Sequence, residues 1–446
     1  MCSNSYAFLI FIFLVSIIQP SAFSSETDLE SINKELTKLK ILVKELEKIN
    51  KLVIPKEGEL VYAVKCNNYR VAKLLLDSGA NINEQDDNGK TPLMLAIERK
   101  NKPLLRLFLE RGADCDIQAN HGFTAIMLAL NIKDEAIKED IVTQILRRNP
   151  NVNLQDYFNR TALMYAIVKA RSKHSEHIVD LILDHQPILS LQDRNGDTAF
   201  ILACKYLAFR CHHNIILKLL QQNPDLDIQN NEGRTAIMEA IQRGGPESDD
   251  LIRDLLFRRP NLDLQDRDGS TALMLAIRYD KASKSLSRVK DLLLLNPDVD
   301  VQDNYGCTAL MLAISLACTQ SSLDLVTEIL AHDPDVDIQT KGGFTALMWA
   351  VLHPDRLISV ELTQKLLDHE PHLEVQNLER QTALTLAAQL ASIEHTEVFE
   401  LLVRAGANPY KGSFLAADRP VDFGKTKAIR KLLKQIAKYV QRNHEI

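Results

Sequence analysis

The sequence contains none of the short motifs that carry catalysis or nucleotide binding. It has no Gly-rich P-loop, no HExxH zinc motif and no sharp turn that presents a nucleophilic Ser or Cys. Two histidine pairs, His174/His177 and His369/His372, have a spacing that could bind a metal, but neither has a third ligand nearby in the sequence. We therefore expect no enzymatic activity, no cofactor and no metal site.

An excess of basic residues is also missing. The net charge of −6 and the pI near 6.1 argue against a protein that binds nucleic acid. Apolar residues make up 46% of the chain, so a hydrophobic core can form. The seven cysteines show no paired CxxC spacing and are too sparse for a disulfide framework, which excludes the common structural zinc folds and small disulfide-rich folds.

The first 25 residues carry no charge at all. Residues 7–18, AFLIFIFLVSII, are about a dozen mostly apolar residues, fewer than the roughly 20 that a membrane span needs. Small residues at Ala22-Phe23-Ser24 resemble a signal-peptidase site. The pattern predicts a signal peptide over residues 1–24 and a secreted or periplasmic protein. An uncleaved signal anchor in a membrane and a buried helix are the alternatives, since no Lys or Arg precedes the apolar run.

A short phrase of the type T-A-L-M-L-A-I returns along most of the chain. Eight intervals separate its threonines, and they measure 33, 37, 37, 37, 36, 37, 37 and 37 residues. These threonines, called the phrase threonines below, are Thr91, Thr124, Thr161, Thr198, Thr235, Thr271, Thr308, Thr345 and Thr382. A fixed period of this length is the mark of a stacked repeat protein.

Each repeat predicts two short helices and a turn-rich segment. In residues 308–344, TALMLAISLA and LDLVTEIL have apolar residues at helical spacing, and DPDVDIQTKGGF carries Pro, Asp and Gly turn signals. Neither helix can bury its apolar face alone, whereas stacked neighbours form a continuous core. We call the turn-rich segment the finger.

The repeats resemble the ankyrin repeat family over roughly residues 55–440. GKTPLMLAI at 89–97 and KLLLDSGANIN at 73–83 are close to the family pattern. The resemblance implies an all-α repeat solenoid of about eleven stacked helix-turn-helix units with β-hairpin fingers. The outermost units are atypical, as the caps of a solenoid usually are.

This sequence departs from the family pattern in three ways. Most units have 37 residues rather than about 33, and we place the four added residues around the junction of the two helices. Seven central units replace the Gly-Ala that ends the second helix by X-Pro, which predicts an extended residue before Pro in place of a left-handed turn. Seven of the eight methionines stand where the family has His, and we expect them to pack in the core.

The two ends of the chain differ from the array of residues 55–418. In residues 25–54, Thr27 begins a capping box, which predicts the start of a helix. Six apolar residues from Leu29 to Leu46 follow at alternating spacings of 3 and 4. This spacing fits a coiled coil that could form a homodimer, or a single helix that caps the first repeat. Residues 419–446 predict a capping repeat whose closing helix is basic and amphipathic. That helix is interpreted as part of the cap rather than as a membrane-binding or partner-binding element.

The resemblance implies binding of another protein through the concave surface that the fingers and first helices form. Aromatic and Arg residues are suited to such contacts. The candidate contact residues lie at finger tips or just before a phrase threonine, and they are Lys90, Phe123, Tyr157, Phe158, Arg160, Asp197, Arg234, Tyr305 and Phe344. We expect a non-enzymatic scaffold for an unidentified protein partner. The alternatives are a structural protein that self-assembles through the N-terminal coiled coil, and a secreted effector that acts on a host protein.

Overall fold

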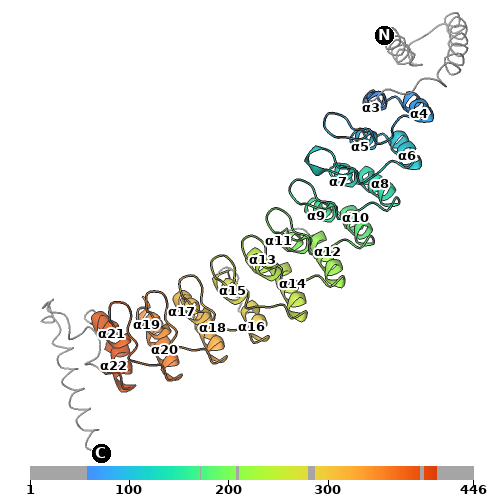
Figure 1. The fold of residues 1–446 in the computed structure, drawn as a ribbon. Helices are drawn as coiled ribbons and strands as arrows, with labels where there is room; N and C mark the ends of the chain where they lie inside the picture. The colour runs from blue at the N-terminus through green and yellow to red at the C-terminus, as the bar shows by residue number, and fades with distance from the viewer. Residues whose placement is uncertain (1–57, 171, 207–209, 280–286, 392–395, 409–446) are drawn as a thin grey trace, which may run out of the picture. The chain divides into compact units, whose positions relative to one another are not determined.

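The computed structural model describes residues 58–170, 172–206, 210–279, 287–391 and 396–408. The predicted signal peptide, the N-terminal coiled-coil segment and the C-terminal capping repeat lie outside these residues. The chain divides into two compact units, one ending at Arg194 and the other beginning at Asn195. The described residues form twenty α-helices, which pair into ten repeats (Figure 1).

The first unit contains four helix pairs. In each pair the two helices pack against one another, and each also packs against its counterpart in the next pair. The pairs are α3 (Glu59–Lys65) with α4 (Tyr69–Asp77), α5 (Pro92–Glu98) with α6 (Lys102–Glu110), α7 (Ala125–Leu130) with α8 (Glu135–Leu146), and α9 (Ala162–Lys169) with α10 (Lys173–Leu183).

The second unit contains six helix pairs with the same arrangement (Figure 1). The first three pairs are α11 (Ala199–Lys205) with α12 (Arg210–Gln221), α13 (Ala236–Arg243) with α14 (Pro246–Phe257), and α15 (Ala272–Tyr279) with α16 (Ser287–Leu293). The last three are α17 (Ala309–Leu316) with α18 (Gln320–Leu330), α19 (Ala346–Val351) with α20 (Arg356–Leu367), and α21 (Ala383–Ala391) with α22 (Thr396–Arg404).

From α5 onward, a phrase threonine directly precedes the first helix of each repeat, whereas α3 follows Gly58. The Thr308 hydroxyl oxygen accepts a hydrogen bond from the backbone N–H of Met311 at 3.4 Å, which satisfies one of the free N–H groups in the first turn. Thr235 is an exception, because its buried hydroxyl has no hydrogen-bond partner among the described residues.

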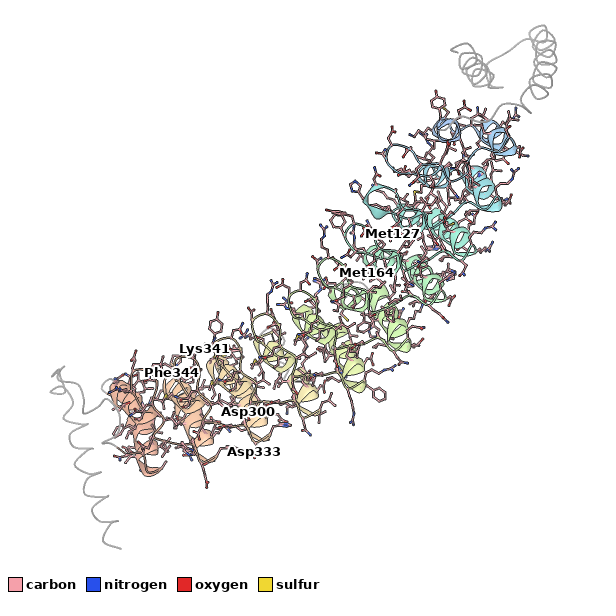
Figure 2. All side chains as sticks on the ribbon, in the orientation of Figure 1. Met127, Met164, Asp300, Asp333, Lys341 and Phe344 are labelled. Carbon is pink, nitrogen blue, oxygen red and sulfur yellow. The ribbon has the colours of Figure 1, made fainter. Side chains whose placement is uncertain are left out.

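The seven repeated methionines lie in the core, as the sequence predicts. Each is at most 2% exposed, and each sits beside the Leu, Ala and Ile of its own phrase. Figure 2 shows Met127 and Met164 on successive first helices of the first unit. Burying one such side chain contributes about 1.5–3 kcal/mol, so the methionines stabilise the stack and are not available to a partner.

Most of the residues added in the 37-residue repeats lie in the second helix. In the short repeat, α6 begins eleven residues after Thr91 and spans 9 residues. In the next repeat, α8 begins eleven residues after Thr124 but spans 12 residues, about one turn more. The insertion therefore lengthens the outer layer of helices rather than the loop between helices.

The expectation of an extended residue before each repeat proline is wrong. Glu370, like the other six residues that precede a repeat proline, has a positive φ near 50°, and Gly79 and Gly112 in the Gly-Ala units also have positive φ, of 91° and 79°. Pro lacks the N–H that Ala113 donates to the Phe108 carbonyl, so the X-Pro turn has one hydrogen bond fewer. The left-handed turn itself is retained, because it points the chain from the second helix into the next finger.

The fingers do not form the expected β-hairpins, since no strand is assigned anywhere in the described part of the chain. Each finger is a tight turn, and in most fingers one polar side chain organises it, although Ala119 holds that position in the finger before Thr124. A carboxylate oxygen of Asp303 accepts backbone N–H bonds from Tyr305 and Cys307, both at 2.9 Å. This is the local bonding that favours Asp and Asn in turns.

Within each unit, a ladder of glutamine side chains joins neighbouring fingers. The Gln302 side-chain amide donates to the Gly306 carbonyl of its own finger at 2.7 Å and to the Gln339 carbonyl of the next finger at 2.9 Å. The same pair of bonds is made by Gln85, Gln118, Gln155, Gln229, Gln265 and Gln339. These glutamines therefore have a structural role in joining the fingers.

Two further bonds complete each joint between neighbouring fingers. In the joint after Gln302, the Lys341 N–H donates to the Tyr305 carbonyl at 2.9 Å, and the Asp335 N–H donates to the Asp300 carboxylate at 3.0 Å. These bonds hold neighbouring fingers rigidly, and the backbone contacts between them set the spacing of the repeats.

We predict that Glu370→Gly stabilises the chain by about 0.5–1 kcal/mol. A left-handed residue with a Cβ costs about 1–2 kcal/mol, and the greater freedom of Gly in the unfolded chain offsets part of this gain. Asn296→Gly is the matched control and should change little, because Asn tolerates this conformation. Urea unfolding followed by circular dichroism measures both. An equal gain in the two variants would show that the turn carries no strain specific to Glu370.

We predict that Gln302→Ala destabilises the joint by about 1–2 kcal/mol, because two hydrogen bonds are lost at a partly exposed site. The urea midpoint should fall, and hydrogen exchange at the Lys341 amide should accelerate. Gln222→Ala removes an exposed amide outside the ladder and is the control. Equal exchange rates at Lys341 in the two variants would contradict a role of the ladder in holding the fingers together.

Candidate partner-binding surface

The candidate contact residues occupy one side of the repeats. This side, called the fingertip surface below, consists of the two residues at the tip of each finger and the residue before each phrase threonine. Figure 2 shows Lys341 and Phe344 on it, on the opposite side of the second unit from Asp300 and Asp333. Tyr157 and Tyr305 are 60% and 71% exposed. Phe158 is also exposed, while Lys90, Phe123, Arg160, Arg234 and Phe344 are half-buried.

Two neighbouring fingers of the first unit build a stack of rings and guanidinium groups. Tyr157 and Phe158 form the tip of one finger, with their rings edge to face at 5.8 Å. Arg194, at the tip of the next finger, places its guanidinium 4.4 Å from the centre of the Tyr157 ring and 5.4 Å from that of Phe158. The Arg194 N–H also donates to the Phe158 carbonyl at 2.9 Å, which fixes the two fingers together.

Arg160 continues this stack toward the first helix. Its guanidinium lies 4.8 Å from the Phe158 ring centre and 4.5 Å from that of Tyr165 in α9. Such contacts are worth about 0.5–1 kcal/mol each at exposed sites. The result is a continuous layer of Tyr157, Phe158, Arg160 and Arg194, which Tyr165 extends to Phe123 at a distance of 5.9 Å between ring centres.

A buried carboxylate holds Arg160 in place. Asp156 accepts bonds from the Arg160 guanidinium at 3.0 and 3.2 Å and from the Tyr165 hydroxyl at 2.7 Å. Burial, followed by the bond to Asp156, raises the pKa of the Tyr165 hydroxyl, so this group stays protonated and remains a donor. The other Asp156 oxygen shapes the finger turn by accepting from Phe158 and Arg160 N–H groups.

The residue before a phrase threonine often reaches the last turn of the first helix. Lys90 pairs with Glu98 at 2.6 Å, and the Arg234 guanidinium bonds the side chain of Gln242, in each case eight residues further on. These side chains therefore lie along the fingertip surface. Glu98 neutralises Lys90 within its repeat, whereas the carboxylate near Arg234 is Asp266 of the next finger, at 3.8 Å.

Asp197 is not a direct contact residue, contrary to the prediction. It is 1% exposed, because its carboxylate is covered while accepting bonds from Lys205 at 3.0 Å and from Asn230 of the next finger at 2.8 Å. Burial alone would lower the pKa of Lys205, but the bond to Asp197 and its charge raise it. Ser270, in the same position two repeats later, is also buried. Both residues support the finger from inside.

The second unit carries a separate apolar group on its fingertip surface. Tyr305 and Leu378 are exposed at tips two repeats apart. The tip between them belongs to Lys341 and Gly342, whose finger begins at Gln339 and ends before Phe344. Leu378 was not predicted, although its place one residue after Asn377 matches Tyr157 and would have identified it as a tip residue.

The side of the second unit away from the fingertips is strongly acidic. Asp298, Asp300, Asp333 and Asp335 lie close together there, and Figure 2 shows two of them. Burial, together with the charges of the three neighbours, raises the pKa of Asp300. The two sides of the repeats therefore differ in character, with aromatic and basic groups at the tips and carboxylates behind them.

The buried thiols of Cys115 and Cys204 are poorly suited to nucleophilic attack. Cys66, Cys115, Cys204, Cys307 and Cys318 are all unpaired. Burial and the charges of Asp116 and Asp114 raise the pKa of Cys115 to about 11, and burial likewise raises the pKa of Cys204. A thiol that stays protonated at neutral pH is a poor nucleophile.

The histidine pairs have carboxylate neighbours that the sequence did not predict. Glu139 from α8 lies between His174 and His177 of α10, at 2.6 and 3.6 Å, and Asp337 contacts His372 at 2.6 Å. Within the described ranges, no three such side chains converge on a point that could hold a metal ion. The helices of these ranges also include none with the length and apolar character needed to cross a membrane.

Comparison with known proteins agrees with this geometry. A family model described as "Ankyrin repeats (3 copies)" matches residues 60–139, 134–228, 170–255, 205–287, 245–318, 282–367 and 314–413, which together cover the array from α3 to α22. A search of curated proteins finds no match.

Proposed function

We propose that this chain, which belongs to the ankyrin repeat family, is a binding scaffold whose fingertip surface holds a partner protein. Ankyrin repeats are generally protein–protein interaction modules, and proteins built from them are typically not enzymes. The layer of Tyr157, Phe158, Arg160 and Arg194 is the observation that carries the proposal. These residues bring large apolar area and directed polar groups to an exposed surface.

The layer is already ordered before a partner arrives. Arg160 is fixed by Asp156, and Arg194 is tied to the preceding finger by its backbone. Long side chains lose about 0.5–1.5 kcal/mol each when an interface immobilises them, and a partner that meets side chains already held avoids much of this cost. The site therefore favours a protein surface that presents carboxylates or aromatic rings to the exposed edges of this layer.

We predict that Tyr157→Ser combined with Phe158→Ser and Arg194→Ser weakens partner capture at least tenfold. Such a loss corresponds to about 1.4 kcal/mol or more, within the range of a single binding hot spot. The wild-type chain is used to capture proteins from extracts, which mass spectrometry identifies. Surface changes of this kind alter folding stability by only about 0.5 kcal/mol, so the urea midpoint should hold.

Tyr69→Ser is the matched control, because Tyr69 is an exposed aromatic of the same unit that lies in α4, away from the fingertips. Proteins captured by the wild type and by this control, but not by the triple variant, support the proposal. Capture of the same proteins by the triple variant would place the binding surface elsewhere.

The N-terminal segments support two companion proposals, export of the chain and self-association. The charge-free residues 1–24 support a secreted or periplasmic protein. The heptad spacing from Leu29 to Leu46 supports a homodimer formed through residues 27–54. A dimer would present two copies of the fingertip surface and strengthen binding to a partner with two matching sites.

We predict that analytical ultracentrifugation gives a dimer mass for a chain that begins at residue 25 and a monomer mass for one that begins at residue 55. The two chains differ only in residues 25–54, which contain the apolar residues from Leu29 to Leu46, so the change in mass reports directly on this segment. Equal masses for the two chains would show that the segment caps the first repeat instead.

A further inference from the structure

The ring of His185 bridges the ends of two neighbouring second helices in the first unit. Its Nδ1 atom lies 2.9 Å from the Leu181 carbonyl oxygen of α10, and its Nε2 atom lies 3.0 Å from the Leu146 carbonyl oxygen at the end of α8. The His185 N–H donates to the Ile182 carbonyl, which leaves the Leu181 oxygen to the ring. One half-buried side chain therefore joins two repeats.

Only a charged imidazole satisfies both of these contacts. Both carbonyl oxygens are acceptors, and a neutral imidazole carries a single N–H. Whichever nitrogen holds that hydrogen, the other nitrogen directs its lone pair at an oxygen no more than 3.0 Å away. An imidazolium donates from both nitrogens. The last carbonyl groups of a helix also carry partial negative charge, which favours a cation at this point.

Arginine takes the same position in two other repeats. The position lies two residues before the repeat proline, or before the Ala that replaces it, and it holds Arg111 and Arg258. Arg111 pairs with Asp77 of its preceding repeat at 2.5 Å, and Arg258 donates to the Asn223 side-chain oxygen of its preceding repeat at 2.8 Å. Arg keeps its charge at every physiological pH. At His185, the equivalent joint depends on a side chain whose charge changes with pH.

Two more histidines of α10 face α8 in the same joint. His174 Nδ1 and His177 Nε2 lie 2.6 and 3.6 Å from the two carboxylate oxygens of Glu139. The neighbouring Lys138 already pairs with Glu135 at 2.7 Å. A proton on either histidine adds a positive charge beside the Glu139 carboxylate, so it strengthens the joint in the same direction as a proton on the ring at the helix end.

The other charged groups around the joint do not pair with the His185 ring. The described ones on the three packed helices and at their ends are Asp134, Asp140, Arg147 and Arg148 for α8, Lys169 for α9, and Glu176, Asp180 and Asp184 for α10. Arg147, Arg148 and Asp184 are nearest to the ring contacts in sequence, and all three are exposed, so solvent and salt screen their charges. Within the described part of the chain, the two carbonyl groups are the polar partners of the ring.

We propose that His185 is a pH-sensitive clamp between α8 and α10. A proton taken up from solvent lets the ring donate to both helix ends, whereas the neutral ring donates to only one of them. The joint between these two repeats therefore tightens on mild acidification. It loosens as the pH rises through the range of about 5 to 8 in which histidine changes charge.

The two clamped helices lead directly into the fingers that carry the aromatic layer. The finger of Tyr157 and Phe158 follows α8, and the finger of Arg194 follows α10. The Arg194 N–H donates to the Phe158 carbonyl at 2.9 Å, so a change in the spacing of the two repeats acts on this bond. Mild acid thus favours the ordered layer. This effect on partner binding rests on the function proposed above, whereas the clamp itself does not.

Hydrogen exchange of the full chain, followed by mass spectrometry at about pH 5.5 and about pH 8, tests the clamp. Rates are corrected for the intrinsic pH dependence of exchange. At the acidic pH, peptides that cover the ends of α8 and α10 should exchange at least about threefold faster in His185→Gln than in the wild type, because bonds to a charged donor are lost. At the basic pH, the difference should fall below about twofold, because the neutral ring keeps only one bond. A peptide that covers Arg194 should follow the same pattern.

His185→Arg restores a permanent charge at this position and should keep slow exchange at both pH values. His369→Gln is the matched control, because His369 holds the same repeat position while its exposed ring makes no hydrogen bond within the described residues. This control should exchange as the wild type does at each pH.

The proposal is overturned if His185→Gln exchanges like the wild type at the acidic pH. It is also overturned if the two differ by the same factor at both pH values, since the ring would then act by packing and not by its charge. The exchange experiment contains no partner, so its failure is separate from a failure of the capture experiment that tests the fingertip surface.

Discussion

The joint between neighbouring fingers is the constraint on which the rest of each unit depends. One side-chain amide, such as that of Gln302, bonds its own finger and the next, and two more bonds lie beside it. Since each repeat contacts only its neighbours, these bonds and the packing of Met and Leu define the stack locally. Added residues are accommodated only where the joint is not disturbed, which is why α8 is longer than α6 while the fingers keep their length.

Buried polar side chains connect this framework to the exposed surface. Asp156 accepts bonds from its own finger turn and also from Arg160 and Tyr165, so a single carboxylate both shapes the finger and positions the aromatic layer. Asp197 links its finger to Lys205 and to the next finger through Asn230. Leaving such a buried group unpaired costs about 1–3 kcal/mol or more. The surface is consequently as rigid as the repeats that carry it.

Features that recur in every repeat could be predicted from the sequence, and features that depend on a neighbour could not. The stacked helix pairs and the buried Met residues follow from the period of the sequence. The left-handed residue before each proline could not be predicted in this way. A residue before Pro locally prefers an extended conformation, but the direction that the next finger must take outweighs this preference. The burial of Asp197 depends on Asn230, 33 residues away, and no pattern within one repeat reveals that contact. The fingers are tight turns in which backbone bonds and the side chain of residues such as Asp303 together satisfy the polar groups.

Residues that build the stack differ from residues that are free to bind a partner. A side chain that repeats with the period and is buried stabilises every joint in the same way. Tyr157, Phe158 and Tyr305 interrupt the period and are exposed, so they add little to folding while retaining much of their apolar area for a partner. A solenoid can therefore carry binding sites at exposed positions without disturbing its core. Each site requires only a few substitutions at positions where the joint bonds make no demand on the side chain.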